Sequence, residues 1–165
     1  MKRLYLTASA CLLMACLIPV SPSLAVVPAA STAGSHFLYM FAHASFLHWL
    51  VNAWSLLVIH NLLRWHRLLT AYTLAVLLSY VPAAVPADSP AGVLGLSVIT
   101  TFFFGFLTPY YWRRNRSIPL MMIALILIGC FIPGVAAAFH VIPFTVGMVY
   151  WHIEGRVRSF LHFIR

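Results

Sequence analysis

The sequence has very few charged residues, since Asp, Glu, Lys and Arg together make up 7% of its 165 residues. Apolar residues (AVILMFWYC) make up 63%, and a water-soluble chain of this length could not bury so much apolar surface. A lipid bilayer stabilises apolar side chains along every helix that crosses it. The composition therefore argues against a soluble domain and predicts an integral membrane protein.

Cysteine is also scarce. The three cysteines, Cys11, Cys16 and Cys130, lie in apolar stretches, where a thiol behaves as a small hydrophobic group. Their spacing suggests neither a disulfide framework nor a metal site. The sequence shows no internal repeat and no soluble domain.

Acidic residues number only two, so the formal net charge is +8. The cations occur in short clusters between apolar stretches, a pattern that sets membrane orientation and does not form a nucleic-acid footprint. We therefore expect no nucleic-acid partner.

Apolar runs of about 17 to 25 residues, separated by breaks rich in Pro, Gly or Arg, predict six membrane-spanning helices. The first helix belongs to residues 1–27, and residues 28–165 form the catalytic core with a short basic cytoplasmic tail. The predicted spans are residues 4–27, 44–63, 68–86, 92–111, 118–133 and 139–155.

Every Lys and Arg falls on one side of these spans, and the opposite loops contain only Asp88 as a charged residue. The positive-inside rule then places both termini in the cytoplasm. The compact basic N-terminus favours a bacterial inner membrane.

The first segment also has the features of a signal peptide, and Leu13 to Cys16 is similar to a lipoprotein cleavage site. Its apolar stretch is longer than a usual signal core, which favours a retained helix. Cleavage would leave the other five helices oriented as before.

Polar side chains inside a span are costly and therefore mark candidate functional sites. His43, His48 and Asn52 lie near the outer end of the second span, and His48 and Asn52, four residues apart, share a helix face. Ser97 is expected about five residues, or about 7 to 8 Å, below the outer start of the fourth span. His140 begins the sixth. All are predicted to lie at one depth.

These side chains fit nucleophilic acyl transfer, which needs a hydroxyl, a base and donors for the developing oxyanion. Ser97 would attack, and His140 would take its proton and return it to the leaving amine. The donors would be His48, Asn52 and the Ser97 amide. No carboxylate is placed to complete a triad.

Glycines lie where close helix packing would be needed. Gly95 is two residues before Ser97, Gly105 is eight after it, and Gly147 is seven after His140. Small residues at such positions let the fourth and sixth spans approach closely, as a serine and a histidine on separate helices require.

Two other functions fit the same residues. Several intramembrane histidines could bind haem or a metal, although no carboxylate or cysteine accompanies them at the outer face. A non-catalytic protein that escorts membrane clients is the second alternative.

The stretch from His43 to Asn52 (HASFLHWLVN) resembles the second-helix motif of the rhomboid family of intramembrane serine proteases. The stretch from Gly95 to Ser97 resembles that family's glycine-x-serine-glycine motif, and His140 with Gly147 resembles its sixth-helix motif. The resemblance covers about residues 37–151 in order and spacing.

This resemblance implies a six-helix rhomboid-like bundle with Ser97 and His140 as the catalytic dyad, His48 and Asn52 as oxyanion donors, and His43 in a structural role. It implies cleavage of transmembrane segments of other proteins near their outer ends, without cofactor or metal. Three positions depart from the family pattern and are expected to alter rate and specificity: Val98 and Pro143, where the family has glycine, and Thr101, where many members have tyrosine.

Overall fold

The computed structural model describes residues 25–26, 31–43, 45–59, 62–81, 95–131 and 136–163. No β-strand element occurs within these ranges, so the predicted all-α class is confirmed. Of the predicted first span, residues 4–24 and residue 27 lie outside the described residues. The elements are α2 (Ala33–Leu38), the 3-10 helix η2 (Tyr39–Phe41), α3 (Phe46–Ile59), α4 (Trp65–Ser79), α5 (Ser97–Trp112), α6 (Ser117–Cys130) and α7 (Ala138–Phe163).

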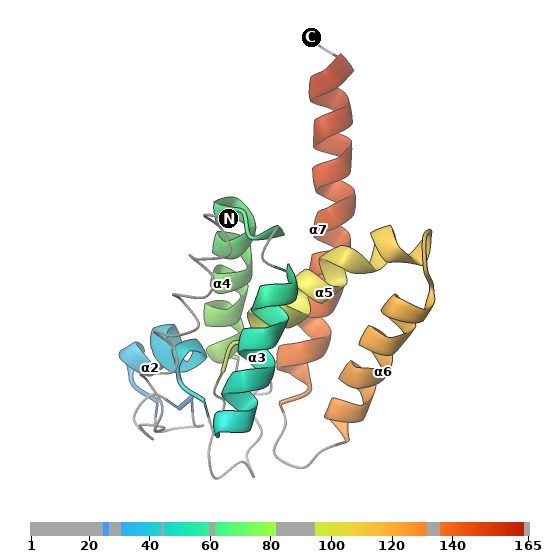
Figure 1. Cartoon of the computed structure of the whole chain (residues 1–165). Coiled ribbons are helices and arrows are strands. Elements are labelled where there is room, and N and C mark those ends of the chain that lie inside the picture. The colour runs from blue at the N-terminus through green and yellow to red at the C-terminus, as the bar shows by residue number, and fades with distance from the viewer. Residues whose placement is uncertain are drawn as a thin grey trace.

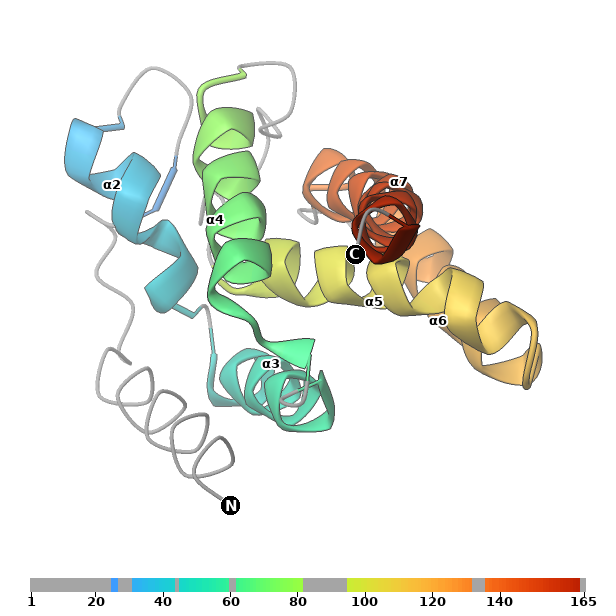
Figure 2. The ribbon, with the colours of Figure 1, turned by 90° about the horizontal axis from the view of Figure 1, so that it is seen from above.

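Helix α5 is the centre of the arrangement, since it contacts α3, α4, α6 and α7. Figure 2 shows it running between α3 on one side and α7 on the other. Its sequence explains this position, because its large apolar side chains cover more than one helix face and are buried on both sides. They are Val98, Ile99, Phe102, Phe103 and Phe106.

Two glycines allow α5 and α7 to cross with their backbones in contact. A methyl group added at Gly105 would overlap the carbonyl group of Phe144, and one added at Gly147 would overlap the carbonyl oxygen of Phe102. Both obstacles are backbone atoms, so no side-chain rotation could make room. The crossing therefore requires glycine at these two positions.

A buried ion pair joins α4 to α7. Arg67 donates from Nε and Nη2 to the two carboxylate oxygens of Glu154, at 2.9 and 2.8 Å, and from Nη1 to the Leu62 carbonyl at 3.1 Å. Its guanidinium also lies over the Phe106 ring of α5, 4.2 Å from the centroid. In the sequence, Arg67 serves only as one of the cations that predict membrane orientation. Nothing in the sequence predicts its pairing with Glu154.

Three helix boundaries differ clearly from their predictions. Helix α4 ends at Ser79, seven residues before the predicted end at residue 86. Helix α5 begins at Ser97, so the prediction that this serine lies about five residues inside its helix is wrong. The reason is Gly95, whose φ of 99° is incompatible with a right-handed helix at that residue. Helix α7 continues to Phe163, past the predicted end at residue 155, and Figure 1 shows it rising beyond the other helices.

Taken one at a time, none of the described helices is both long and apolar enough to cross a bilayer. The segments Ala33–Phe41 and Phe46–Ile59 meet that measure only as a pair, with a bend of 74° between them.

Candidate functional site

The start of α3 positions His48 and Asn52. Ser45 caps the helix, because its Oγ accepts a hydrogen bond from the His48 amide at 3.1 Å. One turn later the Asn52 side chain, buried at 4% exposure, donates from Nδ2 to the His48 carbonyl at 2.9 Å. One N–H of this amide is therefore engaged within α3, and only its second N–H remains for a ligand.

Gly95 brings the start of α5 against His48. Its amide donates to the Tyr39 carbonyl at 2.9 Å, which holds the turn in place. A β-carbon built on Gly95 would lie 2.6 Å from His48 Cε1 and 2.9 Å from Nε2. The His48 ring thus lies against the backbone two residues before Ser97.

Ser97 is the first residue of α5 and is half-buried. Its amide belongs to the first helical turn, where N–H groups have no partner within the helix. Its carbonyl accepts hydrogen bonds from Thr101 Oγ1 at 2.7 Å and Thr100 Oγ1 at 3.1 Å. The Thr101 hydroxyl therefore points back along the helix, where the rhomboid pattern would have an aromatic ring.

His140 lies in the first turn of α7, and its Nδ1 is 3.0 Å from the Ala136 carbonyl. Because a carbonyl only accepts, Nδ1 carries the hydrogen, and the neutral ring presents its lone pair at Nε2. His140 lies near enough to His48 that protonation of one ring would disfavour protonation of the other. The structure forms no hydrogen bond between Ser97 and His140, both of which lie in its described part.

His43 lies between η2 and α3, one residue before the predicted second span, and is fully buried. Its ring meets the His48 ring edge to face, with centroids 5.3 Å apart. In the described part of the chain neither ring nitrogen has a hydrogen-bond partner. Burial, and then the neighbouring His48, lower the pKa of His43 from 6.5 to about 4, so its imidazole is neutral at pH 7.

The structure therefore brings His43, His48 and Gly95 into contact and places His140 within electrostatic reach of His48. Of the departures from the rhomboid pattern, Val98 is fully buried in the core. Pro143 is also fully buried, inside α7, where it lacks the amide that would pair with the residue 139 carbonyl.

Three residues that support this site were not singled out from the sequence. Ser45 had a usable signal, because a serine directly before an apolar helical stretch is typical of an N-cap. Tyr39 and Ala136 contribute backbone carbonyls to Gly95 and His140. Any residue type has a carbonyl, so sequence carries no signal for either.

Comparison of the chain with protein-family models, curated proteins and solved structures gives no match.

Proposed function

We propose that the chain is an intramembrane serine endopeptidase that hydrolyses peptide bonds in or near transmembrane segments of other membrane proteins. The observation that carries this proposal is the neighbourhood of Ser97. A nucleophile candidate begins α5, the glycine two residues before it lies against His48, and His48 lies near a histidine whose Nε2 lone pair is available.

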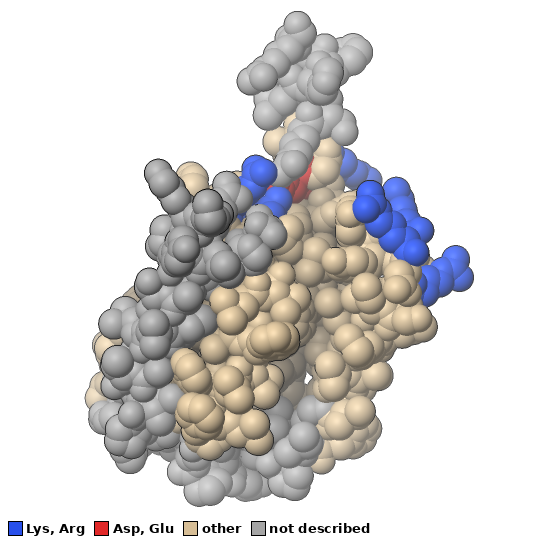
Figure 3. All heavy atoms as spheres, viewed as in Figure 1, with Lys and Arg blue, Asp and Glu red and all other residues tan. Residues whose placement is uncertain are grey.

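Two surface features support a membrane setting. The described helices expose many large apolar side chains, including Leu47 and Trp54 of α3, each 67% exposed, and Ile128 of α6, 60% exposed. The exposed Lys and Arg side chains visible in Figure 3 lie towards one end of the molecule. Helices α3 and α7 begin at the opposite end (Figure 1). We propose a rhomboid-like six-helix bundle with both termini in the cytoplasm of a bacterial inner membrane and the site near the outer surface.

In the proposed reaction Ser97 Oγ attacks the scissile carbonyl carbon while His140 Nε2 takes the hydroxyl proton. The carbon–nitrogen bond then breaks, and the leaving amine receives that proton from Nε2. Water attacks the resulting ester and loses a proton to Nε2. The carbon–Oγ bond then breaks, and Nε2 returns that proton to Ser97 Oγ, which releases the acid and restores the serine. The oxyanion would accept hydrogen bonds from the Ser97 amide, His48 and the second N–H of Asn52.

The client helix would enter sideways between the second and fifth predicted spans, which are α3 and α6, and unwind locally before reaching Ser97. The reaction would need no cofactor. The expected partners are the transmembrane protein substrate and the lipid bilayer. Ser97 and His140 must move into hydrogen-bond contact when substrate binds, since apo geometry at such dyads is often loose.

Ser97 and His140 form no hydrogen bond in the described structure. This also favours one alternative, a rhomboid-like protein that binds membrane clients without cleaving them. The metal alternative receives no such support, because the described residues place no three metal-ligating side chains together.

Cleavage of a reporter membrane protein in co-expression separates these functions. We expect Ser97→Ala and His140→Ala each to reduce cleavage at least about a thousandfold. Ser55→Ala is the matched control for the serine, because the Ser55 hydroxyl donates within its own helix, to the Val51 carbonyl. His152→Ala, on the exposed part of α7, is the control for the histidine.

Wild-type cleavage in either site variant would contradict the proposal. A fluorophosphonate probe should label the wild-type protein and fail to label Ser97→Ala. Absence of labelling in a folded wild-type protein that still binds clients would favour the non-catalytic alternative.

A further inference from the structure

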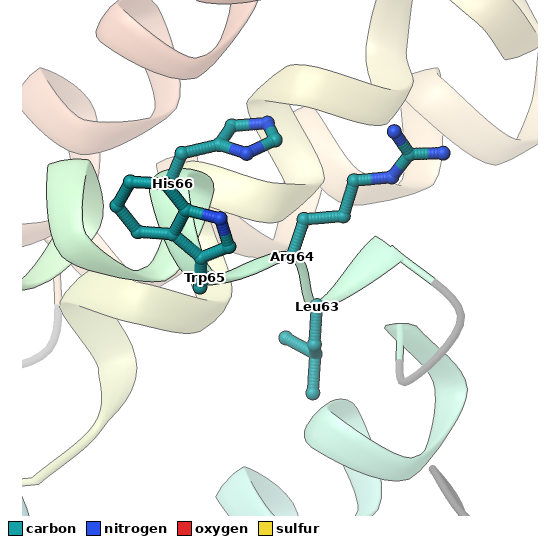
Figure 4. A pocket seen from close by; sticks show the side chains of 4 residues that line it. All are labelled: Leu63, Arg64, Trp65 and His66. Carbon is teal, nitrogen blue, oxygen red and sulfur yellow. The ribbon is translucent and has the colours of Figure 1, made fainter.

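A hollow of about 510 Å³ lies at the turn joining α3 to α4, lined by Leu63, Arg64, Trp65 and His66. Arg64 is exposed, and Trp65 is 76% exposed. The Trp65 and His66 rings meet edge to face, with centroids 5.8 Å apart. Figure 4 shows the Arg64 side chain extending away from these rings, so the hollow has a cation on one side and aromatic groups on the other.

Arg64 differs from its neighbour Arg67 in having no carboxylate partner within the described ranges. Arg67 is bound to Glu154 and to the Leu62 carbonyl. No carboxylate neutralises Arg64 in this part of the chain, and the whole chain carries a formal net charge of +8. An exposed guanidinium in a positive field favours binding of an anion such as a phosphate group.

An exposed, mainly apolar stripe continues from the hollow along α4. Trp65, Leu69, Thr73 and Leu77 follow one another at four-residue spacing and so share a helix face. Leu69 is 55% and Leu77 is 61% exposed. The distance from Trp65 to Leu77 is about 18 Å at 1.5 Å per residue, close to the half-thickness of a bilayer core, about 15 Å.

We propose that this hollow and stripe bind one anionic phospholipid, with its phosphodiester on Arg64 and an acyl chain along Leu69 and Leu77. The headgroup would lie over Trp65 and His66, residue types suited to a membrane interface. A soluble anion would use the cation and leave the apolar stripe uncovered, which is why an amphiphile fits better. The inference rests on the membrane setting proposed above and is independent of catalysis.

The test is native mass spectrometry of the full chain released from micelles that contain equal amounts of phosphatidylglycerol and phosphatidylcholine. Wild-type protein should retain phosphatidylglycerol in preference. Arg64→Gln should lower that preference at least about tenfold, since a hydrogen bond to a charged group contributes about 1.5–3 kcal/mol. Arg64→Lys should keep most of the preference. Leu69→Gln should weaken retention of both lipids alike.

Arg114→Gln is the matched control. It removes the same charge, but the Arg114 guanidinium stacks on the Tyr110 ring at 4.2 Å and lies outside the hollow. The lipid preference of this variant should change by no more than about fivefold, because only the diffuse contribution of a basic residue near an anionic surface, about 1 kcal/mol, is lost. Equal losses in Arg64→Gln and Arg114→Gln would indicate a diffuse field and overturn the proposal.

Complete displacement of phosphatidylglycerol by millimolar inorganic phosphate would also overturn the proposal, because it would leave the apolar stripe without a role. If Arg64→Gln does not fold, the Leu69→Gln variant provides the test. Unchanged lipid retention in Leu69→Gln would refute the proposed lipid site. Ser97→Ala should retain lipid like the wild type, so failure of the lipid site and failure of the protease proposal give different results.

Discussion

Replacing Gly95 with alanine should damage both folding and the site, through two separable effects. The φ of 99° at Gly95 lies in a region that residues with a β-carbon rarely adopt, and forcing alanine into it costs about 1–3 kcal/mol. The new β-carbon would also lie 2.6 Å from His48 Cε1, about 1 Å inside a normal carbon–carbon contact. The His48 ring must therefore shift by about 1 Å.

The two effects have different measurements. Unfolding in detergent by denaturant titration should show the backbone penalty of about 1–3 kcal/mol together with the cost of displacing the His48 ring. Reporter cleavage should show the ring displacement as a loss of about a hundredfold, which is the typical effect of a 1 Å misplacement at a reacting centre. Gly155→Ala is the control, because an added methyl group there would meet nothing within 4 Å.

A double-mutant cycle tests the steric part directly. In a His48→Ala background the ring is gone, so Gly95→Ala should lose only its backbone penalty and show a smaller total loss of stability. An identical stability loss in both backgrounds would refute the claimed contact. Unchanged stability and cleavage in the single variant would refute the whole argument.

Three further outcomes follow from the structure. Glu154→Gln leaves the Arg67 guanidinium buried without its carboxylate, so the unfolding free energy should fall by about 3–5 kcal/mol; a loss as small as that of the exposed Thr145→Ala would contradict the buried pair. Gly147→Ala should lower stability by about 1–3 kcal/mol, because its methyl group would overlap the Phe102 carbonyl. An unchanged thermal unfolding temperature would contradict this and would mean that α5 and α7 can separate to make room. His43 is neutral when folded, with a pKa lowered from 6.5 to about 4, whereas the unfolded chain binds a proton below about pH 6.5. Stability should therefore fall as pH drops from 6.5 to 4, by up to about 3 kcal/mol, and this part of the loss should end below pH 4. The same pH dependence in His43→Leu would show that His43 is not its source.

Much of the local structure was predictable from the sequence because it depends on residue type and spacing. The start of α4 and both ends of α6 lie within about three residues of the predicted spans because Arg, Pro and Ser mark those breaks. The end of α4 was predicted seven residues too late, at residue 86 instead of Ser79. Helix α2 was missed, since six residues are too few to give a clear periodic pattern. The start of α5 was misplaced because the apolar pattern continues through Gly95 and does not reveal its backbone angle.

The sequence by itself determined that the chain is helical, strongly apolar and cationic at its polar breaks, and it singled out Ser97, His140, His48 and Asn52. These properties follow from composition and order along the chain. Tertiary structure alone decided that Glu154 pairs with Arg67, 87 residues away, that the Asn52 amide bonds its own helix, and that the Ala136 carbonyl leaves the His140 lone pair at Nε2. Such contacts depend on where separate helices meet and on which atoms then face each other, and residue order does not specify that geometry.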